Sequence, residues 1–198
     1  QIETRKGIRL NIIAMANSRK LLMDPRGIGG NWQERLRQTR EGYSLEDLYG
    51  MVDAHHLENL IAVDNTASMD LVEKYPELIR NGFDLVSSNK IANTRAYSFY
   101  RNLRKELREH QKQYLYETNV GAGLPLIDTI RLLHLSGENI TRIRGVFSGS
   151  LGYIFNEFSR GGRPFSEILR EAMQAGYTEP DLREDLSGND VGRKLLIL

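Results

Sequence analysis

The chain has 198 residues, with 27 Lys and Arg against 26 Asp and Glu, and it contains no Cys. A formal net charge of +1, with both signs mixed along the chain, excludes a dedicated nucleic-acid or polybasic membrane surface. The absence of Cys excludes disulfides, thiolate metal sites and a Cys nucleophile. Apolar runs are too short to span a bilayer and no signal-like stretch opens the chain, so we expect a protein of the cytoplasm, or of an organelle interior such as a plastid.

The first part of the chain alternates between strand-like and helix-like apolar patterns, which is typical of an α/β fold. Ser44 followed by Asp47 predicts a capped helix start, and Asn81-Gly82 predicts a helix end. The expected elements are a strand over 8–16, a loop over 17–30, helices over 32–39 and 44–54, a buried strand over 59–63, a helix over 69–80, a strand over 83–88, a helix over 92–110 and a strand over 114–117.

The second part continues with helices and one expected strand. The expected elements are a turn over 121–125, a helix over 125–135 that starts at Pro125, a strand over 139–147, helices over 150–159 and 165–175, a polar stretch over 177–187 and a last helix from about Gly188. We therefore expect a parallel-sheet region over residues 1–118 and an α+β region over residues 119–198.

Two of the predicted strands end in small polar residues, at 64–68 and at 87–90. In open α/β sheets, ligands bind beyond the carboxyl ends of the strands, where helix N-termini favour anions. These ends are therefore candidates for a nucleotide crevice. The alternative is that Thr66, Ser68 and Asn89 are ordinary helix caps.

The first predicted strand ends in the basic turn Asn17-Ser18-Arg19-Lys20, which contains no acid. Enzymes that select NAD usually place an acidic residue after a strand to bind the ribose hydroxyl, whereas cations suit the 2′-phosphate of NADP. If a dinucleotide binds, Arg19 therefore favours NADP. The alternative is a solvated basic turn.

The segment 121–126 has the sequence GAGLPL and lies between a predicted strand and a predicted helix. Leu126 stands where a dinucleotide fingerprint needs its third glycine, so the segment is not a phosphate-binding loop. Its glycines instead allow backbone carbonyls to point inward, and together with Glu117 these would suit a hard cation. A plain turn is the alternative.

The densest group of ionisable residues lies in the acidic loop over 176–190 and the helix that follows it. Asp190 and Lys194 are spaced i, i+4, so they lie on one helix face. A lysine beside a carboxylate suits general acid–base catalysis. The alternatives are a surface ion pair and a helix N-cap formed by Ser187 with Asp190.

Four segments of the chain resemble homoserine dehydrogenases, most closely the form fused to aspartokinase in bifunctional enzymes. The resemblance extends over nearly the whole chain and implies an incomplete Rossmann-like nucleotide-binding region over 1–118, without its first strand and Gly-rich loop, and a truncated substrate and dimerisation region over 119–198. We expect such a chain to bind dinucleotide poorly and to be inactive alone. The segments are SNKIANT (88–94), YETNVGAGLP (116–125), FSGSLGYIFNEF (147–158) and GYTEPDLREDLSGNDVGRKLLIL (176–198).

The resemblance implies reversible NAD(P)-linked interconversion of L-homoserine and L-aspartate 4-semialdehyde, on the route to threonine and methionine, by a homo-oligomer. It also implies particular residue roles, to which the basic turn adds Arg19 as a cofactor contact. The implied roles are catalysis by Lys194 and Asp190, substrate binding by Glu179, Asp185 and Asp190, cofactor binding by Thr66, Lys90 and Gly176, and sodium binding by Glu117 with the carbonyls of Val120, Ala122 and Leu124.

Two other functions are consistent with the sequence. One is a catalytically silent dehydrogenase-like module that serves assembly or regulation, although such a module would not need the acidic and lysine set. The other is a related oxidoreductase that acts on a different amino-acid semialdehyde.

Overall fold

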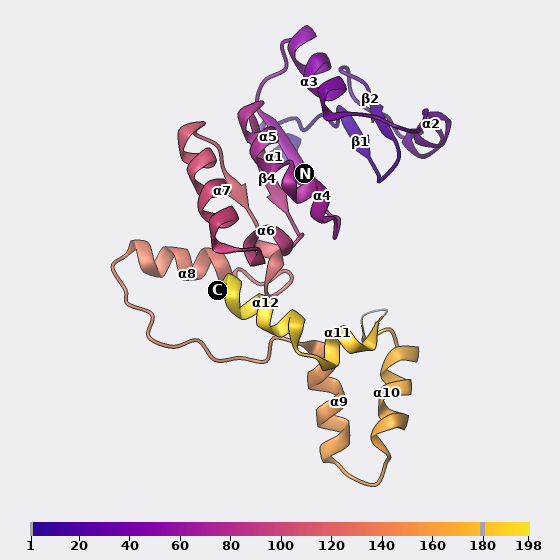
Figure 1. Cartoon of the computed structure of the whole chain (residues 1–198), viewed down its shortest axis with the longest axis vertical. Helices are drawn as coiled ribbons and strands as arrows, with labels where there is room; N and C mark the ends of the chain where they lie inside the picture. Colours follow the sequence, from indigo (N-terminus) through magenta and orange to yellow (C-terminus); the bar gives the residue numbers. More distant parts are fainter. Residues whose placement is uncertain (1, 179–180) are drawn as a thin grey trace. The chain divides into compact units, whose positions relative to one another are not determined.

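A computed structural model describes residues 2–178 and 181–198. The chain divides into two compact units, Gln1–Leu60 and Ile61–Leu198, and each is described by itself (Figure 1). Among the described residues, no helix is long and apolar enough to cross a bilayer.

The first unit contains a small antiparallel hairpin and short helices. In the hairpin, Ala14 pairs with Met23 and Ala16 with Leu21. The elements are α1 (Ile2–Lys6), β1 (Ala14–Ala16), β2 (Leu21–Met23), α2 (Trp32–Gln38) and α3 (Leu45–Ala54).

The hairpin corrects the prediction of one strand over 8–16 followed by a loop. Only the end of that segment forms a strand, and the expected loop contains β2. The reason is the turn at Asn17, whose Oδ1 accepts the backbone N–H groups of Arg19 and Lys20, each at 2.9 Å. A side chain that bonds its own backbone a few residues on reverses the chain locally.

The two helices predicted for this unit are confirmed. The Asp47 carboxylate accepts the backbone N–H of Ser44 at 3.2 Å, which is the capping-box contact expected from the sequence. Leu48 and Val52, four residues apart on one face of α3, are buried.

The second unit contains a sheet of order β3-β4-β5. β4 and β5 are parallel, with Leu85 opposite Tyr114 and Val86 opposite Leu115, so the expected parallel sheet is confirmed. The elements of this part are β3 (Leu60–Asp64), α4 (Met69–Glu73), α5 (Tyr75–Arg80), β4 (Phe83–Ser87), α6 (Ile91–Thr94), α7 (Tyr97–Glu109) and β5 (Tyr114–Leu115).

The core of this sheet lies on one face. Phe83, Leu85 and Ser87 alternate with partly exposed residues along β4, and Ile79 and Leu103 from the covering helices are fully buried. β3 is not the buried strand that the sequence predicted. Its ends are buried, but its two middle β-branched side chains, Ile61 and Val63, are 51% and 62% exposed.

Two long helices predicted from the sequence are each divided in two. Pro76 lies in the first turn of α5, where a residue without an N–H is tolerated, so a new helix begins after α4 ends at Glu73. The extended backbone of Arg95 separates α6 from α7. α7 consequently starts after Ala96.

Beyond β5 the described regular structure is helical. The expected strand over 139–147 does not form in this fully described segment, where Val146 is 83% exposed. A short helix lies instead in the stretch expected to be irregular. The elements are the 3-10 turn η1 (Glu117–Asn119), α8 (Leu126–Leu135), α9 (Gly149–Ser159), α10 (Phe165–Gln174), α11 (Leu182–Leu186) and α12 (Asn189–Ile197).

α9 and α10 pack against each other as a helical pair (Figure 1). Ile154 of α9 and Ile168 and Ala172 of α10 are fully buried between them.

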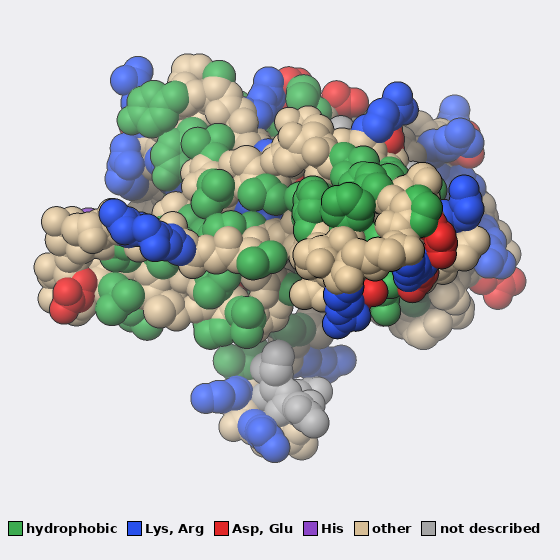
Figure 2. All heavy atoms as spheres, turned by 90° about the horizontal axis from the view of Figure 1, so that it is seen from below, with side chains coloured by type: hydrophobic (Ala, Val, Ile, Leu, Met, Phe, Trp, Pro, Cys, Tyr) green, Lys and Arg blue, Asp and Glu red, His purple; other side chains and the backbone are tan. Residues whose placement is uncertain are grey.

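Hydrophobic side chains also reach the surface in several places on the face shown in Figure 2. In the second unit, the large exposed hydrophobic side chains include Leu132 and Leu135 of α8.

Candidate functional site

Two lysines converge on one carboxylate in the second unit. Asp190 Oδ2 lies 2.6 Å from Lys194 Nζ, one helical turn along α12, and Asp190 Oδ1 lies 3.3 Å from Lys90 Nζ, at the start of α6. The predicted i, i+4 pair is therefore confirmed. We call Lys90, Asp190 and Lys194 the lysine–aspartate cluster.

The cluster is mostly shielded from solvent, with side-chain exposures of 30% for Lys90, 20% for Lys194 and 21% for Asp190. Burial alone would raise the pKa of the Asp190 carboxyl, but the hydrogen bond from Lys194 and the charge of Lys90 outweigh it and hold this pKa below its ordinary value of 3.8. Asp190 is thus ionised at neutral pH beside two cationic side chains. The cluster carries net positive charge, which suits an anion or a developing oxyanion.

Lys194 is also fixed by the backbone of a distant segment. Its Nζ donates a hydrogen bond at 2.7 Å to the carbonyl of Phe147, just before α9. The sequence contains no signal for this contact, because a backbone carbonyl is available at every residue. Lys194 Nζ, which also contacts Asp190, therefore links α12 to the segment just before α9.

Lys90 and Lys194 line a cavity of about 790 Å³. Its other walls come from residues within 118–126, from α8, from residues within 140–149 and from Leu198. Cavities of about 300–1,000 Å³ with a mostly apolar lining and a few polar groups are typical of small-molecule sites. The lysine–aspartate cluster therefore adjoins a space large enough for a small substrate.

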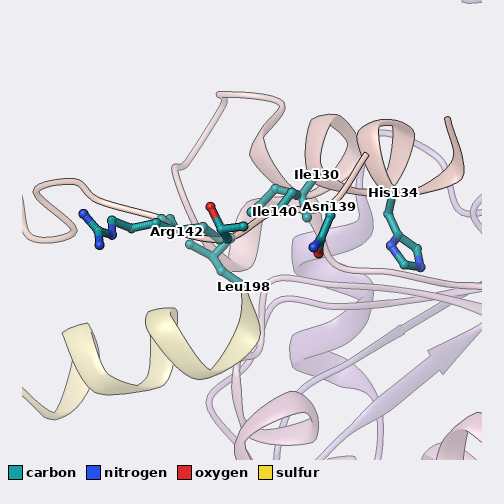
Figure 3. A pocket seen from close by; sticks show the side chains of 8 residues that line it. Ile130, His134, Asn139, Ile140, Arg142 and Leu198 are labelled. Carbon is teal, nitrogen blue, oxygen red and sulfur yellow. The ribbon is translucent and has the colours of Figure 1, made fainter. Parts of the chain in front are cut away.

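A second cavity of about 450 Å³ lies beside α8 and is lined in part by His134 and Asn139. Figure 3 shows Ile130 and Ile140 near Leu198, whereas the guanidinium of Arg142 extends away from them. Neither lysine of the cluster lines this second cavity.

The polar ends of β3 and β4 meet, as their positions in a sheet predict. The Asn89 side-chain amide donates to Asp64 Oδ2 at 3.1 Å, and the Thr66 backbone N–H donates to Asp64 Oδ1 at 2.7 Å. Ser68 caps α4 by accepting the N–H of Leu71 at 3.2 Å, so the cap interpretation is correct for Ser68.

A buried tyrosine completes this network, and sequence reasoning did not identify it. The Tyr75 hydroxyl donates to Asp64 Oδ2 at 2.6 Å and lies 2.9 Å from Ser87 Oγ. Burial and the bond to Asp64 raise the pKa of Tyr75 far above its ordinary value, so the hydroxyl stays protonated. The network joins β3, α5 and β4 beneath the strand ends.

The remaining substrate and cofactor candidates lie in several places. Asp185 on α11 is buried, and Glu179 lies outside the described residues. Gly176 ends α10 as predicted, in the left-handed conformation at φ +72°. Arg19, in the first unit, is exposed at the hairpin turn.

The loop proposed from sequence to hold a cation is a turn joined to α8. Glu117 accepts the N–H of Ile127 on Oε1 and that of Asp128 on Oε2, each at 2.9 Å. The carbonyl of Leu124 accepts the N–H of Leu126 at 2.9 Å. These oxygens are of the type that sodium prefers, and each has a second lone pair.

The same loop is unsuited to a dinucleotide, as its sequence indicated. A Cβ placed on Gly121 would lie 2.5 Å from the Leu126 side chain, so Leu126 fills the space above this glycine. Among the described residues, no group of three or more His, Asp and Glu side chains is placed to hold a metal ion.

A parallel sheet with polar strand ends, beside a cavity lined by two lysines, is an arrangement typical of nucleotide-binding α/β enzymes. Comparison with known families identifies which one. A family model described as the NAD binding domain of homoserine dehydrogenase matches residues 1–117, and one described as homoserine dehydrogenase matches residues 125–198. The chain belongs to the homoserine dehydrogenase family.

Curated relatives include a bifunctional aspartokinase/homoserine dehydrogenase of Buchnera aphidicola, which is 43% identical over all of this chain and 24% of the relative. A homoserine dehydrogenase of Schizosaccharomyces pombe is 39% identical over 84% of this chain and 45% of the relative. The chain spans about a quarter of the length of the bifunctional relatives.

Solved structures agree on the fold. A hyperthermophilic archaeal homoserine dehydrogenase in complex with NADPH is similar at a TM-score of 0.77 and 25% identity, over 99% of this chain and 62% of that one. A Candida auris protein described as of unknown function is similar at a TM-score of 0.82 and 28% identity, over 94% of this chain and 54% of that one.

Proposed function

We propose that this chain supplies the proton-transfer and substrate-binding groups for the NAD(P)-linked interconversion of L-homoserine and L-aspartate 4-semialdehyde, within a protein that also carries an aspartokinase. The single observation that carries the proposal is the placement of Asp190 between Lys90 and Lys194 beside a cavity of about 790 Å³. Family membership supplies the reaction class, and the cluster supplies groups suited to it.

In the oxidative direction the substrate alcohol loses a hydride from carbon and a proton from oxygen. The nicotinamide, when bound, accepts the hydride. Lys194 in its neutral form accepts the hydroxyl proton, and in the reverse reaction its ammonium form returns a proton to the aldehyde oxygen. Asp190 holds the Nζ in place and stabilises the ammonium that forms, while Lys90 places a second positive charge near the reacting oxygen.

For the substrate, Asp185 and Glu179 are proposed to bind the ammonium group of the amino acid. Carboxylates are suitable partners for a zwitterion whose amino end is cationic.

For the cofactor, we assign Thr66, Lys90, Gly176 and Arg19 as contacts and expect a preference for NADP. The exposed Arg19 and the acid-free basic turn support this preference, because a 2′-phosphate needs cationic neighbours. Replacing Arg19 by Ala should raise the KM for NADP and leave that for NAD nearly unchanged.

For the cation, Glu117 and the carbonyls of Val120, Ala122 and Leu124 are proposed to bind sodium. The hard oxygen donors of this loop support the assignment. We further propose a homo-oligomer located in the cytoplasm, or in a plastid if the source is a plant.

The decisive experiment is Lys194→Ala in the natural full-length protein, with homoserine-dependent NADP reduction as the assay. Turnover should fall by on the order of 100-fold or more, because a general acid–base group is lost, while NADPH binding stays nearly unchanged. Intact turnover would remove Lys194 from its role. If the wild-type protein shows neither turnover nor a thermal shift with homoserine, the chain is a silent assembly or regulatory module instead.

A further inference from the structure

Asn89 is the buried residue directly before the first lysine of the cluster, with 3% of its surface exposed. Its side-chain Nδ2 donates to Asp64 Oδ2 and to the carbonyl of Ser68, each at 3.1 Å. Its Oδ1 accepts the N–H of Ile91 at 3.0 Å, and its own backbone N–H donates to Ser87 Oγ at 2.9 Å. Asn89 therefore connects the ends of β3 and β4, the cap of α4 and the first turn of α6.

The lysine that follows depends on such connections for its position. Lys90 is the N-cap residue of α6, which has four residues and is too short to be stable through its own hydrogen bonds. The far end of α6 is fixed in a similar way, since Asn93 Nδ2 donates to the buried Asn119 Oδ1 at 3.2 Å. Buried amide side chains thus hold both ends of the segment that carries Lys90.

We propose that Asn89 is a positioning residue for the dehydrogenase reaction, acting through Lys90. By anchoring the backbone of α6 to Asp64 and Ser68, Asn89 keeps the Lys90 ammonium 3.3 Å from Asp190. The inference rests on the proposed function, because it gives Lys90 a place in the reaction.

The test uses Asn89→Ser in the natural full-length protein. A serine hydroxyl still accepts the nearby N–H of Ile91, but it is too short to reach Asp64 and Ser68. We expect kcat to fall on the order of 10- to 100-fold, because small displacements of a catalytic group have effects of this size. The KM for homoserine should change by less than about threefold, since the loss concerns the reacting geometry rather than uniform binding.

Tyr75→Phe is the matched control. It removes the hydroxyl that bonds the same Asp64 oxygen at 2.6 Å, and it leaves every side-chain partner of Asn89 in place. This variant should lower the melting temperature but keep kcat within about twofold of wild type, because the cross-strand anchor of α6 remains. Equal losses of kcat in Tyr75→Phe and Asn89→Ser would mean that Asn89 is merely structural.

Repeating the test in a Lys90→Ala background separates the positioning role of Asn89 from the proposed function of the chain. If Asn89 acts through Lys90, Asn89→Ser lowers kcat by less than about threefold in that background, because residues that act as a unit are non-additive. An unchanged loss in both backgrounds would overturn the positioning role and leave the function intact. Wild-type kcat in Lys90→Ala alone would instead overturn the proposed role of Lys90.

If thermal unfolding shows that Asn89→Ser does not fold, Asn89→Gln replaces it in the same cycle. This variant keeps an amide and adds no charge beside Asp64, but its extra methylene displaces the donor from Asp64 and Ser68. The same non-additivity with Lys90→Ala is expected, and additive losses would count against the positioning role.

Discussion

Asp190 faces two ammonium groups from different elements, so its ionisation depends on the folded structure. The sequence indicated one of these partners, Lys194, because the i, i+4 spacing of a helix is a local property. The sequence contained no indication that Lys90 would lie 3.3 Å from Asp190. It also contained no indication that Lys194 would bond the Phe147 carbonyl at 2.7 Å. Contacts between residues about 50 or 100 positions apart are set by packing, which spacing alone does not encode.

The lowered pKa of Asp190 predicts how the free energy of unfolding depends on pH. A carboxyl whose pKa is lower in the folded chain stabilises it above the unfolded pKa of about 3.9, and this stabilisation is lost as pH falls through the folded value. The difference in unfolding free energy between wild type and Asp190→Asn should be constant above about pH 5 and shrink below about pH 4. Urea unfolding at a series of pH values measures it.

The hydrogen bond from Lys194 is the larger of the favourable influences on Asp190. A Lys194→Gln variant should therefore show a weaker acid-induced loss of stability than wild type. A difference between wild type and Asp190→Asn that persists undiminished at pH 2 would contradict a lowered pKa.

Gly176 provides a residue-scale test of backbone conformation. Its φ of +72° and the bonds from its own N–H to Met173 and from Tyr177 to Ala172 form a Schellman helix end. Gly176→Ala should destabilise the chain by about 1 kcal/mol, because an L side chain is strained at positive φ. Gly192→Ala, inside α12 with nothing within 4 Å of the new Cβ, should instead be neutral or stabilising by up to about 1 kcal/mol. Thermal unfolding distinguishes the two substitutions.

At the scale of elements, Glu117 shows how one side chain can start a helix from outside it. Its two oxygens accept the N–H groups of Ile127 and Asp128, which have no partner within α8. Glu117→Ala should destabilise the chain by about 1–2 kcal/mol, as loss of a helix cap does. Glu117→Gln, which keeps one acceptor oxygen, should have a smaller effect in urea unfolding, and equal effects would argue against capping.

Elements with a local cause were predictable. The Ser44 cap, the stop at Asn81-Gly82 and the α10 end at Gly176 all depend on a few neighbouring residues. The strand expected over 139–147 failed because alternating apolar residues become a strand only beside a partner strand. Pro76 is also a local signal, which the expected helix over 69–80 overlooked, because a proline inside a helix has no N–H for the backbone bond and clashes with the preceding turn. The division at Arg95 has no comparable local signal.

At the scale of the whole molecule, the division into two compact units predicts how the chain unfolds. The chain has a single Trp, Trp32, which lies on α2 in the first unit, whereas the longest helices lie in the second. Trp fluorescence should therefore report the first unit and far-UV circular dichroism mainly the second. Because units with separate cores need not unfold together, we expect the two urea transitions not to coincide. Superimposable transitions would show that the chain unfolds as one cooperative body.

The hydrogen bond from Lys194 to the Phe147 carbonyl bears on the geometry of the proposed proton transfer. An ammonium group carries three N–H bonds in a tetrahedral arrangement. Contacts at 2.6 Å to Asp190 and 2.7 Å to Phe147 fix two of these directions, and together they determine the third. The third N–H direction, along which the proposed proton transfer would take place, is therefore set by α12 and by the segment just before α9.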